Sequence, residues 1–510
     1  MVSFLSEAVA DGIARGLSPT TMLYCTFGVC LGMLVGVLPG VGIMATIALL
    51  MPLTYHLDPL TGISMLAGIY YGAVYGGSTA SILLNLPGTA STAITCLDGY
   101  PMAKQGRAGV ALFMTAIASF VGSILGIALL ASFSFPLANL ALKFASQEYF
   151  ALMVLGLVTS AMISSSTPLK SLTMVVLGLL IGLVGVDLNS GVMRYTFGIV
   201  HFFDGLSLVA ISLGLFGLTE LMRNAGMSYS GTLSPKDITF RSMIPTRDDW
   251  RRSIPAMLRG SGVGAFFGAL PGTGGMVASF VAYAVERRVN KDPERFGKGA
   301  IEGISGPEGA NNAAVQTAFI PTLTLGIPGD PIMAMMLGVF LIHGIVPGPG
   351  IMVNDPGMFW GPIVTFLMGN LILIILNIPL IGLWIRILAI PYSILFPAIV
   401  GFLCIGIYSV NYSVVDLYVL LAFGLMGYAL IYFEFPIAPM LLGLILGPLM
   451  EENFRRAMLL QSGNPIGFFQ RPISVTFLAI SAMLIAYMVF AEFRKRSRIK
   501  SQAAVLPAEN

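Results

Sequence analysis

The sequence predicts an all-α polytopic membrane protein with about ten to thirteen transmembrane or re-entrant segments. Its 510 residues are 56% hydrophobic and only 10% charged, whereas soluble proteins carry roughly 25% charged residues. Apolar stretches close to the roughly 17 to 25 residues that a membrane-crossing helix needs recur along the chain. The clearest are 110–133, 172–186, 359–378, 394–410, 417–433 and 475–490. A soluble protein with buried helices would need far more polar surface.

A recurring interruption predicts two repeated halves. GVLPGVG at Gly36 returns as GALPGTG at Gly268, 232 residues later, and SILLNLPGTASTA (81–93) resembles TLTLGIPGDPIMA (322–334). Duplicated halves with broken helices are typical of secondary transporters, in which the substrate lies near the membrane midplane. We expect inverted repeats and an elevator-like movement by analogy with other ion-coupled carriers, although the segment count leaves parallel repeats open.

The polar stretches predict the boundaries of these halves. Residues 1–222 form the first transmembrane repeat, 223–260 a polar linker, 261–492 the second repeat with additional helices, and 493–510 a basic tail. Lys and Arg gather in the linker and the tail. Because basic loops mark the cytoplasmic side, we expect the linker and the tail to lie in the cytoplasm. The lipid bilayer is the expected surroundings of the protein, and no nucleic-acid partner is expected.

The interruptions suggest a binding site for an anion and a cation. Proline removes a backbone donor and glycine tolerates unusual dihedral angles, so a Pro-Gly step ends one helix and lets another begin. Within a membrane such a break survives only where protein or a wet cavity surrounds it. The new helix offers free amides and a positive dipole end to an anion, and the ended helix offers carbonyls to sodium. Hydroxyls that could cap these helices or bind substrate belong to Thr89, Ser91, Thr92 and Thr273.

One ionisable residue stands directly at a break. Asp330 follows Pro328 and Gly329 and precedes an apolar run. A charge inside a membrane is costly and usually functional, so Asp330 is the leading candidate for ion coupling, with a helix cap at the protein surface as the alternative. Glu308 and the asparagines after it either line the cavity or cap a helix, and the sequence leaves both readings open.

Four long strings, in order along the chain, carry a family resemblance: GVLPGVG, SILLNLPGTASTAITCLDGYPMAKQGRAG, PERFGKGAIEGISGPEGANNA and FIPTLTLGIPGDPIMAMMLGVFLIHGIVPGP. With them the chain resembles the large permease subunit of tripartite tricarboxylate transporters. The resemblance implies a multi-pass protein of the bacterial inner membrane that imports tri- or dicarboxylates. It also implies two partners, a small four-span membrane subunit and a periplasmic solute-binding protein. No cofactor is implied besides a coupling ion, sodium or a proton.

The same motifs imply the site residues. They carry Asp330 over as a site position, while its role in ion coupling is expected from its place at the break, as is sodium at the Pro-Gly breaks. The implied substrate-binding positions are Pro39, Gly40 and Gly42; Asn85, Pro87, Gly88 and Thr89; Pro271, Gly272, Thr273 and Gly274; Asn311 and Asn312; and Pro328 and Gly329. No Lys or Arg lies within the four breaks, so amides, hydroxyls, asparagines and a bound cation would hold the substrate.

A passive anion channel and an intramembrane enzyme are the alternatives to a carrier. A passive anion channel would show ring-forming filters or pore-lining charges, whereas duplicated halves with midplane breaks fit a carrier better. An intramembrane aspartyl protease is the other class, because IPGD resembles GxGD. However, Ile327 replaces the first glycine and no partner aspartate stands centrally in another apolar segment. We therefore expect no enzymatic activity.

Overall fold

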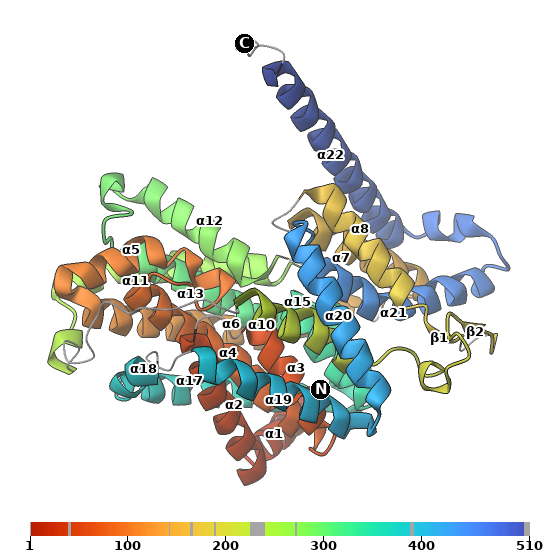
Figure 1. The fold of residues 1–510 in the computed structure, drawn as a ribbon, viewed down its shortest axis with the longest axis horizontal. Helices are drawn as coiled ribbons and strands as arrows, with labels where there is room; N and C mark the ends of the chain where they lie inside the picture. Colours follow the sequence, from red (N-terminus) through yellow and green to blue (C-terminus); the bar gives the residue numbers. More distant parts are fainter. Residues whose placement is uncertain are drawn as a thin grey trace. The chain divides into compact units, whose positions relative to one another are not determined.

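The computed structural model describes residues 2–38, 42–141, 143–163, 167–187, 190–224, 240–270, 273–387 and 392–503. Helices dominate these residues, and the strands among them are the short antiparallel pair β1 (Gly185–Val186) and β2 (Met193–Arg194) (Figure 1). The predicted all-α class is therefore confirmed.

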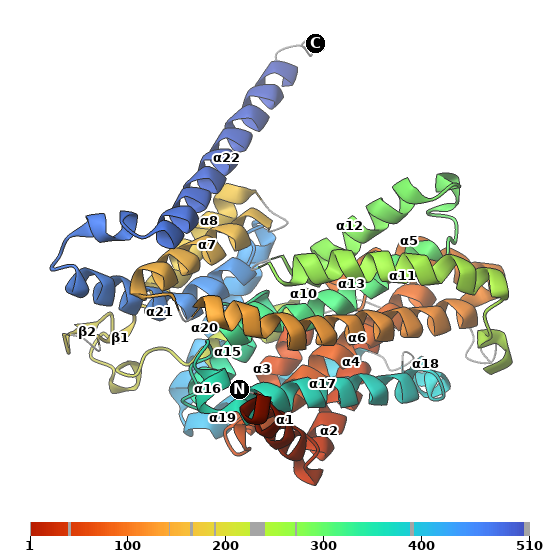
Figure 2. The same ribbon diagram turned by 180° about the vertical axis from the view of Figure 1, so that it is seen from behind.

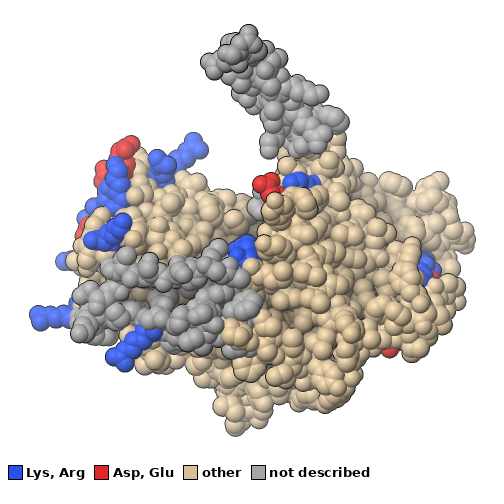
Figure 3. Space-filling view, viewed as in Figure 1, with Lys and Arg blue, Asp and Glu red and all other residues tan. Residues whose placement is uncertain are grey.

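Several described helices are suited to a membrane. Five of them are long and apolar enough to cross one: Pro19–Val37, Cys96–Ser134, Pro356–Asn377, Val414–Tyr432 and Pro472–Phe490. Shorter apolar helices of 10 to 17 residues accompany them. On the face shown in Figure 3, most of the surface carries no charged side chain. These features together indicate a multi-pass membrane protein.

The chain forms two compact units, each made of two segments. Unit 1 comprises Met1–Leu142 and Ser207–Tyr428, and unit 2 comprises Lys143–Leu206 and Ala429–Asn510. Unit 2 thus takes one segment from either side of the predicted linker, whereas the linker itself lies within the second segment of unit 1. Of that linker, residues 225–239 lie outside the described part, and residues 247–260 already belong to a helix.

Unit 1 holds the predicted breaks. Its elements are α1 (Val2–Gly16), α2 (Pro19–Val37), α3 (Ile43–Thr54), α4 (Pro59–Leu84), η1 (Ala90–Ala93), α5 (Cys96–Met102), η2 (Ala103–Arg107), α6 (Ala108–Ala141), α9 (Leu208–Ser212), η4 (Leu213–Leu218), α10 (Thr219–Asn224), η6 (Phe240–Met243), α11 (Arg247–Gly268), α12 (Gly274–Val289), η7 (Pro293–Arg295), α13 (Glu302–Thr317), α14 (Phe319–Leu325), α15 (Pro331–Ile342), α16 (Ile351–Asn354), α17 (Pro356–Asn377), α18 (Ile381–Ile387), α19 (Tyr392–Asn411) and α20 (Val414–Tyr432). Figures 1 and 2 show α11, α12 and α13 side by side.

Several helices of unit 1 begin at a polar residue followed by proline. Ser18, Asp58, Asp330 and Asp355 each accept a backbone hydrogen bond from the first turn, and the next residue is proline in every case. The side chain satisfies amides that lack a partner within the helix, and proline at the first position has no amide to satisfy. These starts follow from local sequence alone.

Two helix pairs of unit 1 pack backbone against backbone. A Cβ atom built on any of three glycines of α2 would lie 2.1 to 2.3 Å from a backbone oxygen of α4, and three glycines of α11 would meet α13 at 2.0 to 2.3 Å. Small residues four positions apart allow such close approach between membrane helices. The six glycines are Gly28, Gly32 and Gly36 in α2 and Gly260, Gly264 and Gly268 in α11. Corresponding members are 232 residues apart, the spacing of the first pair of sequence motifs.

Unit 2 consists of α7 (Ser146–Ile163), α8 (Pro168–Ile181), η3 (Val200–Phe202), α21 (Ala438–Leu460), η8 (Pro465–Phe469) and α22 (Pro472–Ala503), together with β1 and β2. Its helix α8 packs tightly on α21, where a Cβ atom on Gly178 would lie 2.0 Å from the Met440 oxygen. Unit 2 also contains a cluster of ion pairs. Arg194 and Arg455 bind Glu451 at 2.9 and 2.7 Å, and Arg455 also binds Asp187 at 3.1 Å.

Candidate functional site

The first break is described only on its two sides. Pro39 and Gly40 lie outside the described residues, and Gly42 begins α3. The Glu220 carboxylate accepts the Gly42 amide, and a Cβ atom on Gly42 would lie 1.8 Å from Glu220 Oε2. A carboxylate of the protein itself thus occupies the positive end of α3. Glu220 was not singled out in the sequence, because only the packing of α10 brings it to this helix start.

The third break, at the start of α12, is likewise described in part. Pro271 and Gly272 lie outside the described residues. The Thr273 hydroxyl donates to the carbonyl oxygens of Phe267 and Leu270, so it closes the end of α11. It makes no hydrogen bond that caps α12, because its proton goes to these two carbonyls, so the cap reading of Thr273 is wrong, while its role as a substrate ligand stays a prediction.

The start of α12 faces two predicted site residues. Gly274 adopts a left-handed backbone, φ 64°, and a Cβ atom there would lie 3.4 Å from Cβ of Asp330. A Cβ atom on Gly275 would lie 2.4 Å from Asn311 Oδ1. Glycine at 275 therefore lets the chain approach α13 closely, whereas glycine at 274 is favoured by its positive φ. The structure brings Gly274, Asn311 and Asp330 together, although their order in the sequence separates them.

Asp330 is a buried helix cap. Its Oδ1 accepts the Met333 amide at 2.8 Å, and its Oδ2 accepts the Tyr70 hydroxyl at 2.7 Å. Only 3% of the residue is exposed, so the cap does not lie at the protein surface as the alternative reading supposed. Among the ion pairs of the described residues, none involves Asp330. The sequence alone does not single out Tyr70, because the run of small residues that follows it is equally typical of a helix-packing face.

The two predicted asparagines differ in what they offer a ligand. Asn311 is 1% exposed, and neither polar atom of its side chain has a hydrogen-bond partner among the described residues. Asn312 donates to the Glu308 carbonyl one turn back, at 3.0 Å. A buried side-chain amide without a partner is costly, so the Asn311 side chain is available to bind a ligand. The Asn312 side chain already donates to a carbonyl of its own helix.

The second and fourth breaks have matching backbones. Asn85 ends α4 and Gly326 ends α14, both left-handed, at φ 58° and 70°. Thr89 and Asp330 follow in extended conformation as the next helix caps. A Pro-Gly step, Pro87–Gly88 or Pro328–Gly329, lies between each helix end and cap.

The two segments lie on different neighbours. A Cβ atom on Gly88 would meet Gly36 O at 2.2 Å and Cα of Gly77 at 2.4 Å, so this break packs onto α2 and α4. A Cβ atom on Gly329 would meet Cα of Ala318 at 3.0 Å. These glycine contacts lie within each break's own half, but both segments also touch the other half: η1, which follows the second break, packs on α12 and α13, and Asp330 of the fourth break binds Tyr70 of α4.

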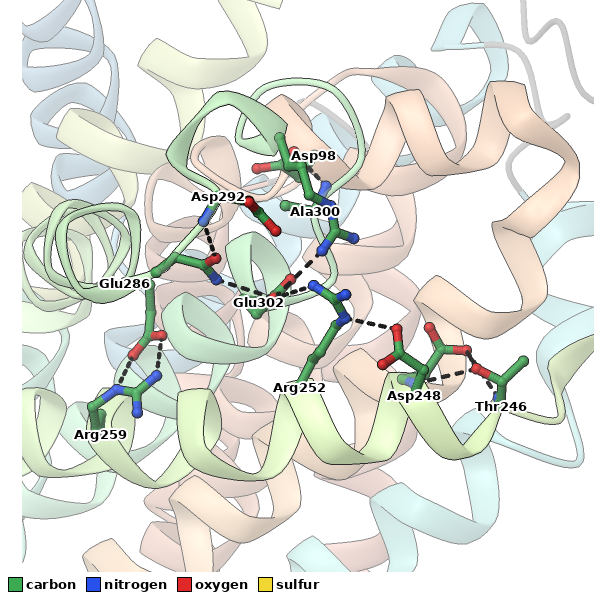
Figure 4. A network of polar contacts seen from close by, with 12 residues as sticks. Asp98, Thr246, Asp248, Arg252, Arg259, Glu286, Asp292, Ala300 and Glu302 are labelled. Atoms are coloured by element: carbon green, nitrogen blue, oxygen red, sulfur yellow. Dashed lines mark hydrogen bonds and ion pairs between the residues drawn. The ribbon is translucent and has the colours of Figure 1, made fainter.

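A separate group of carboxylates lies at the charged end of unit 1 (Figure 4). Asp98 accepts three backbone amides of the α12–α13 loop at 2.8 to 2.9 Å, and the Tyr283 hydroxyl at 2.9 Å. Glu286 binds Arg259, and Glu302 binds Arg252. These acids hold helices together, since each one is matched by donors of the protein.

Exposed basic side chains surround this end, and Figure 3 shows several of them. They are Lys104, Arg251, Arg287, Arg288, Lys291 and Lys298. No group of three or more His, Cys, Asp or Glu side chains suited to a metal occurs in the described part of the chain.

The site chemistry therefore centres on the start of α12. Helix α12 begins beside Asn311 and Asp330, so its positive end faces them, and burial strengthens every electrostatic interaction there. Free amides and the Asn311 side chain suit a carboxylate, and the Asp330 carboxylate suits a cation. An anion beside an ionised Asp330 would be repelled unless a cation neutralised that carboxylate.

Comparison with known proteins gives a consistent result. The sequence model of the Tripartite tricarboxylate transporter TctA family matches residues 22–442, which include every predicted site residue. A relative from Agrobacterium vitis, described as an uncharacterized 52.8 kDa protein in the TAR-I ttuC' 3' region, is 46% identical over 489 residues, 96% of this chain and 97% of that protein. A second A. vitis protein, in the TAR-II ttuC' 3' region, is 48% identical over 233 residues, 46% of this chain and 96% of that protein. No solved structure matches.

Proposed function

The chain belongs to the tripartite tricarboxylate transporter TctA family, and from this premise we propose that it imports tri- or dicarboxylates, citrate-like or related organic acids, on a sodium or proton gradient. It is the large permease subunit and works in the bacterial inner membrane. Its partners are a small four-span membrane subunit and a periplasmic solute-binding protein. The basic end of unit 1 faces the cytoplasm, in line with the positive-inside rule.

The observation that carries this proposal is the approach of Gly274, Asn311 and Asp330 at the start of α12. The substrate carboxylate binds the α12 amides and Asn311, as anions do at helix starts. It lies beside Asp330, which is buried and has no basic partner among the described ion pairs. Because two negative charges repel strongly in a low-dielectric site, the substrate binds well only when a cation neutralises Asp330. Ion and substrate therefore travel together.

A two-fold organisation of unit 1 supports a carrier rather than a channel. The glycine contacts of α2 with α4 and of α11 with α13 recur at a spacing of 232 residues, and the left-handed ends at Asn85 and Gly326 recur at 241. Matched halves with broken helices are the architecture in which alternating access occurs by movement of one part against another. An elevator-like movement of inverted repeats is our expectation for this chain.

The decisive experiment is uptake of labelled citrate into proteoliposomes that contain the partner proteins, with sodium and pH varied. Asp330→Asn is expected to raise the half-saturating ion concentration about tenfold or more, while the substrate affinity changes less. Asp58→Asn is the matched control, because Asp58 also caps a helix that begins with proline and asparagine caps as well as aspartate does.

Three results count against the proposal. An unchanged ion dependence in Asp330→Asn would remove that residue from coupling. An equal shift in Asp58→Asn would trace the effect to helix capping. Downhill flux that ignores both gradients would favour the passive anion channel.

A further inference from the structure

Glu308 is a buried carboxylate surrounded by hydroxyls from other helices. Its Oε1 accepts the Ser78 hydroxyl of α4 at 2.7 Å and the Thr95 hydroxyl just before α5 at 2.6 Å. The Ser119 hydroxyl of α6 lies 3.4 Å from Oε2. The residue is 1% exposed on α13. Four segments distant in the sequence thus meet at one carboxylate.

No positive charge of the protein balances Glu308 in the described residues, where none of the ion pairs includes it. An isolated charge within a membrane protein is costly, and such residues face a partner or a functional ligand. Hydrogen bonds from hydroxyls reduce this cost but supply no net charge. A single positive charge is the missing component.

The second oxygen of Glu308 is bound more loosely than the first. The 3.4 Å between Oε2 and Ser119 Oγ exceeds the range of about 2.5 to 3.0 Å for a hydroxyl hydrogen bond. It matches the spacing of neighbouring oxygens around a hard cation, because ligands at about 2.4 Å in octahedral geometry lie about 3.4 Å apart. This spacing is compatible with a cation held between the two oxygens.

Two further buried hydroxyls without partners lie one helical turn from residues of this cluster. Thr115 stands one turn before Ser119 on α6, and Ser305 stands one turn before Glu308 on α13. Both are buried, and neither hydroxyl has a hydrogen-bond partner in the part of the chain that the structure describes. Buried hydroxyls normally find a partner, so these two indicate an unfilled polar site. An all-oxygen set with one carboxylate suits a hard monovalent cation rather than calcium, which takes several carboxylates.

We propose that Glu308, Ser119 and the adjoining hydroxyls of Ser78 and Thr95 form a sodium-binding site, separate from Asp330 and from the Pro-Gly breaks. The bound ion neutralises Glu308 and joins α4, α6 and α13.

The site adjoins the proposed substrate site through one helix. Asn311 follows Glu308 by three residues on α13, which is one helical turn. Sodium at Glu308 would fix the turn that presents Asn311 to the substrate. This link to uptake rests on the proposed function, whereas sodium binding itself does not.

The test is equilibrium binding of ²²Na⁺ to purified protein in nanodiscs, without substrate. The wild type is expected to bind sodium saturably against a choline background. Glu308→Gln should abolish this binding, and Ser119→Ala should weaken the affinity about tenfold. Ser134→Ala is the matched control, since Ser134 is also buried on α6 but donates to its own helix at the Leu130 carbonyl, 2.6 Å away. This control should bind as the wild type does.

Several outcomes would overturn the site. They are no saturable sodium binding by the wild type, unchanged binding in Glu308→Gln, or equal weakening in Ser119→Ala and Ser134→Ala. The mild Ser119→Ala change keeps the test valid if Glu308→Gln fails to fold. Labelled citrate uptake, measured in parallel, separates the two proposals. If the protein binds sodium as expected but takes up no citrate, only the proposed function is contradicted. If it takes up citrate normally but its sodium binding does not depend on Glu308, only this site is contradicted.

Discussion

The close contact between α11 and α13 predicts that a side chain at Gly264 destabilises the protein. A Cβ atom at this position would lie 2.0 Å from the Ala310 oxygen and 2.6 Å from its Cα, both backbone atoms that no rotamer change can move. Gly264→Ala must therefore push the two helices apart by about 1 Å. A gap of roughly 0.5 to 1 Å already forfeits a quarter to a half of the dispersion attraction.

Gly262 on the same helix provides the matched control, because nothing lies within 4 Å of a Cβ atom built there. Both substitutions gain about the same helix propensity, close to 1 kcal/mol. Their difference in stability therefore isolates the steric effect. Overpacking costs about 1 to 3 kcal/mol, and the rigid backbone at the contact places Gly264→Ala at the upper end.

Thermal unfolding of the purified variants in detergent, followed by tryptophan fluorescence, measures this difference. We expect Gly262→Ala to melt at or above the wild-type temperature and Gly264→Ala to melt below it, with lower citrate uptake because α13 carries Asn311. Equal melting temperatures for the two variants would refute the packing argument. Gly32→Ala tests the same contact between α2 and α4, where the Cβ atom would lie 2.3 Å from the Ile69 oxygen.

Two other predictions concern single contacts. Thr273→Val removes the hydroxyl that closes α11, so we expect a loss of about 1 to 3 kcal/mol and reduced uptake with normal membrane insertion; uptake and melting at wild-type levels would contradict this. Burial raises the pKa of Glu451, but hydrogen bonds from Arg194 and Arg455 outweigh it and hold the pKa below its usual value. The ionised Glu451 therefore stabilises unit 2 above the unfolded-state pKa of about 4.3, and this stabilisation is lost as the pH falls through the folded-state pKa. Glu451→Gln should lower the melting temperature at pH 7 and lose that effect in acid, whereas an equal deficit at all pH values would exclude the ion pairs as its cause.

The asymmetry between the breaks bears on how the site works. At the start of α3 a protein carboxylate, Glu220, already accepts the Gly42 amide. At the start of α12 the nearest predicted partners are Asn311 and Asp330. The Asp330 carboxylate, however, caps α15 by accepting the Met333 amide. The free positive end therefore belongs to the second half, which favours it as the place where an external carboxylate binds.

Properties that depend on short stretches of chain were predictable from the sequence. Composition established the membrane class, and Asp-Pro and Ser-Pro pairs marked helix starts, because a cap depends only on residues within one turn. Pro-Gly steps also marked the ends of α4 and α14 for the same local reason. The motifs placed Asn311 and Asp330 among the site candidates, although Pro39, Gly40, Pro271 and Gly272 lie outside the described residues.

Which side chains meet was decided only by the tertiary structure. The Tyr70 hydroxyl reaches Asp330 across 260 residues, and Glu308 meets Ser78 across 230 and Thr95 across 213. These pairs depend on the axial register at which helices pack, and that register follows from the sum of many glycine and side-chain contacts. A shift of one residue would turn a different face toward each carboxylate. Sequence alone therefore determined that the chain carries buried acids and broken helices, and packing determined their partners.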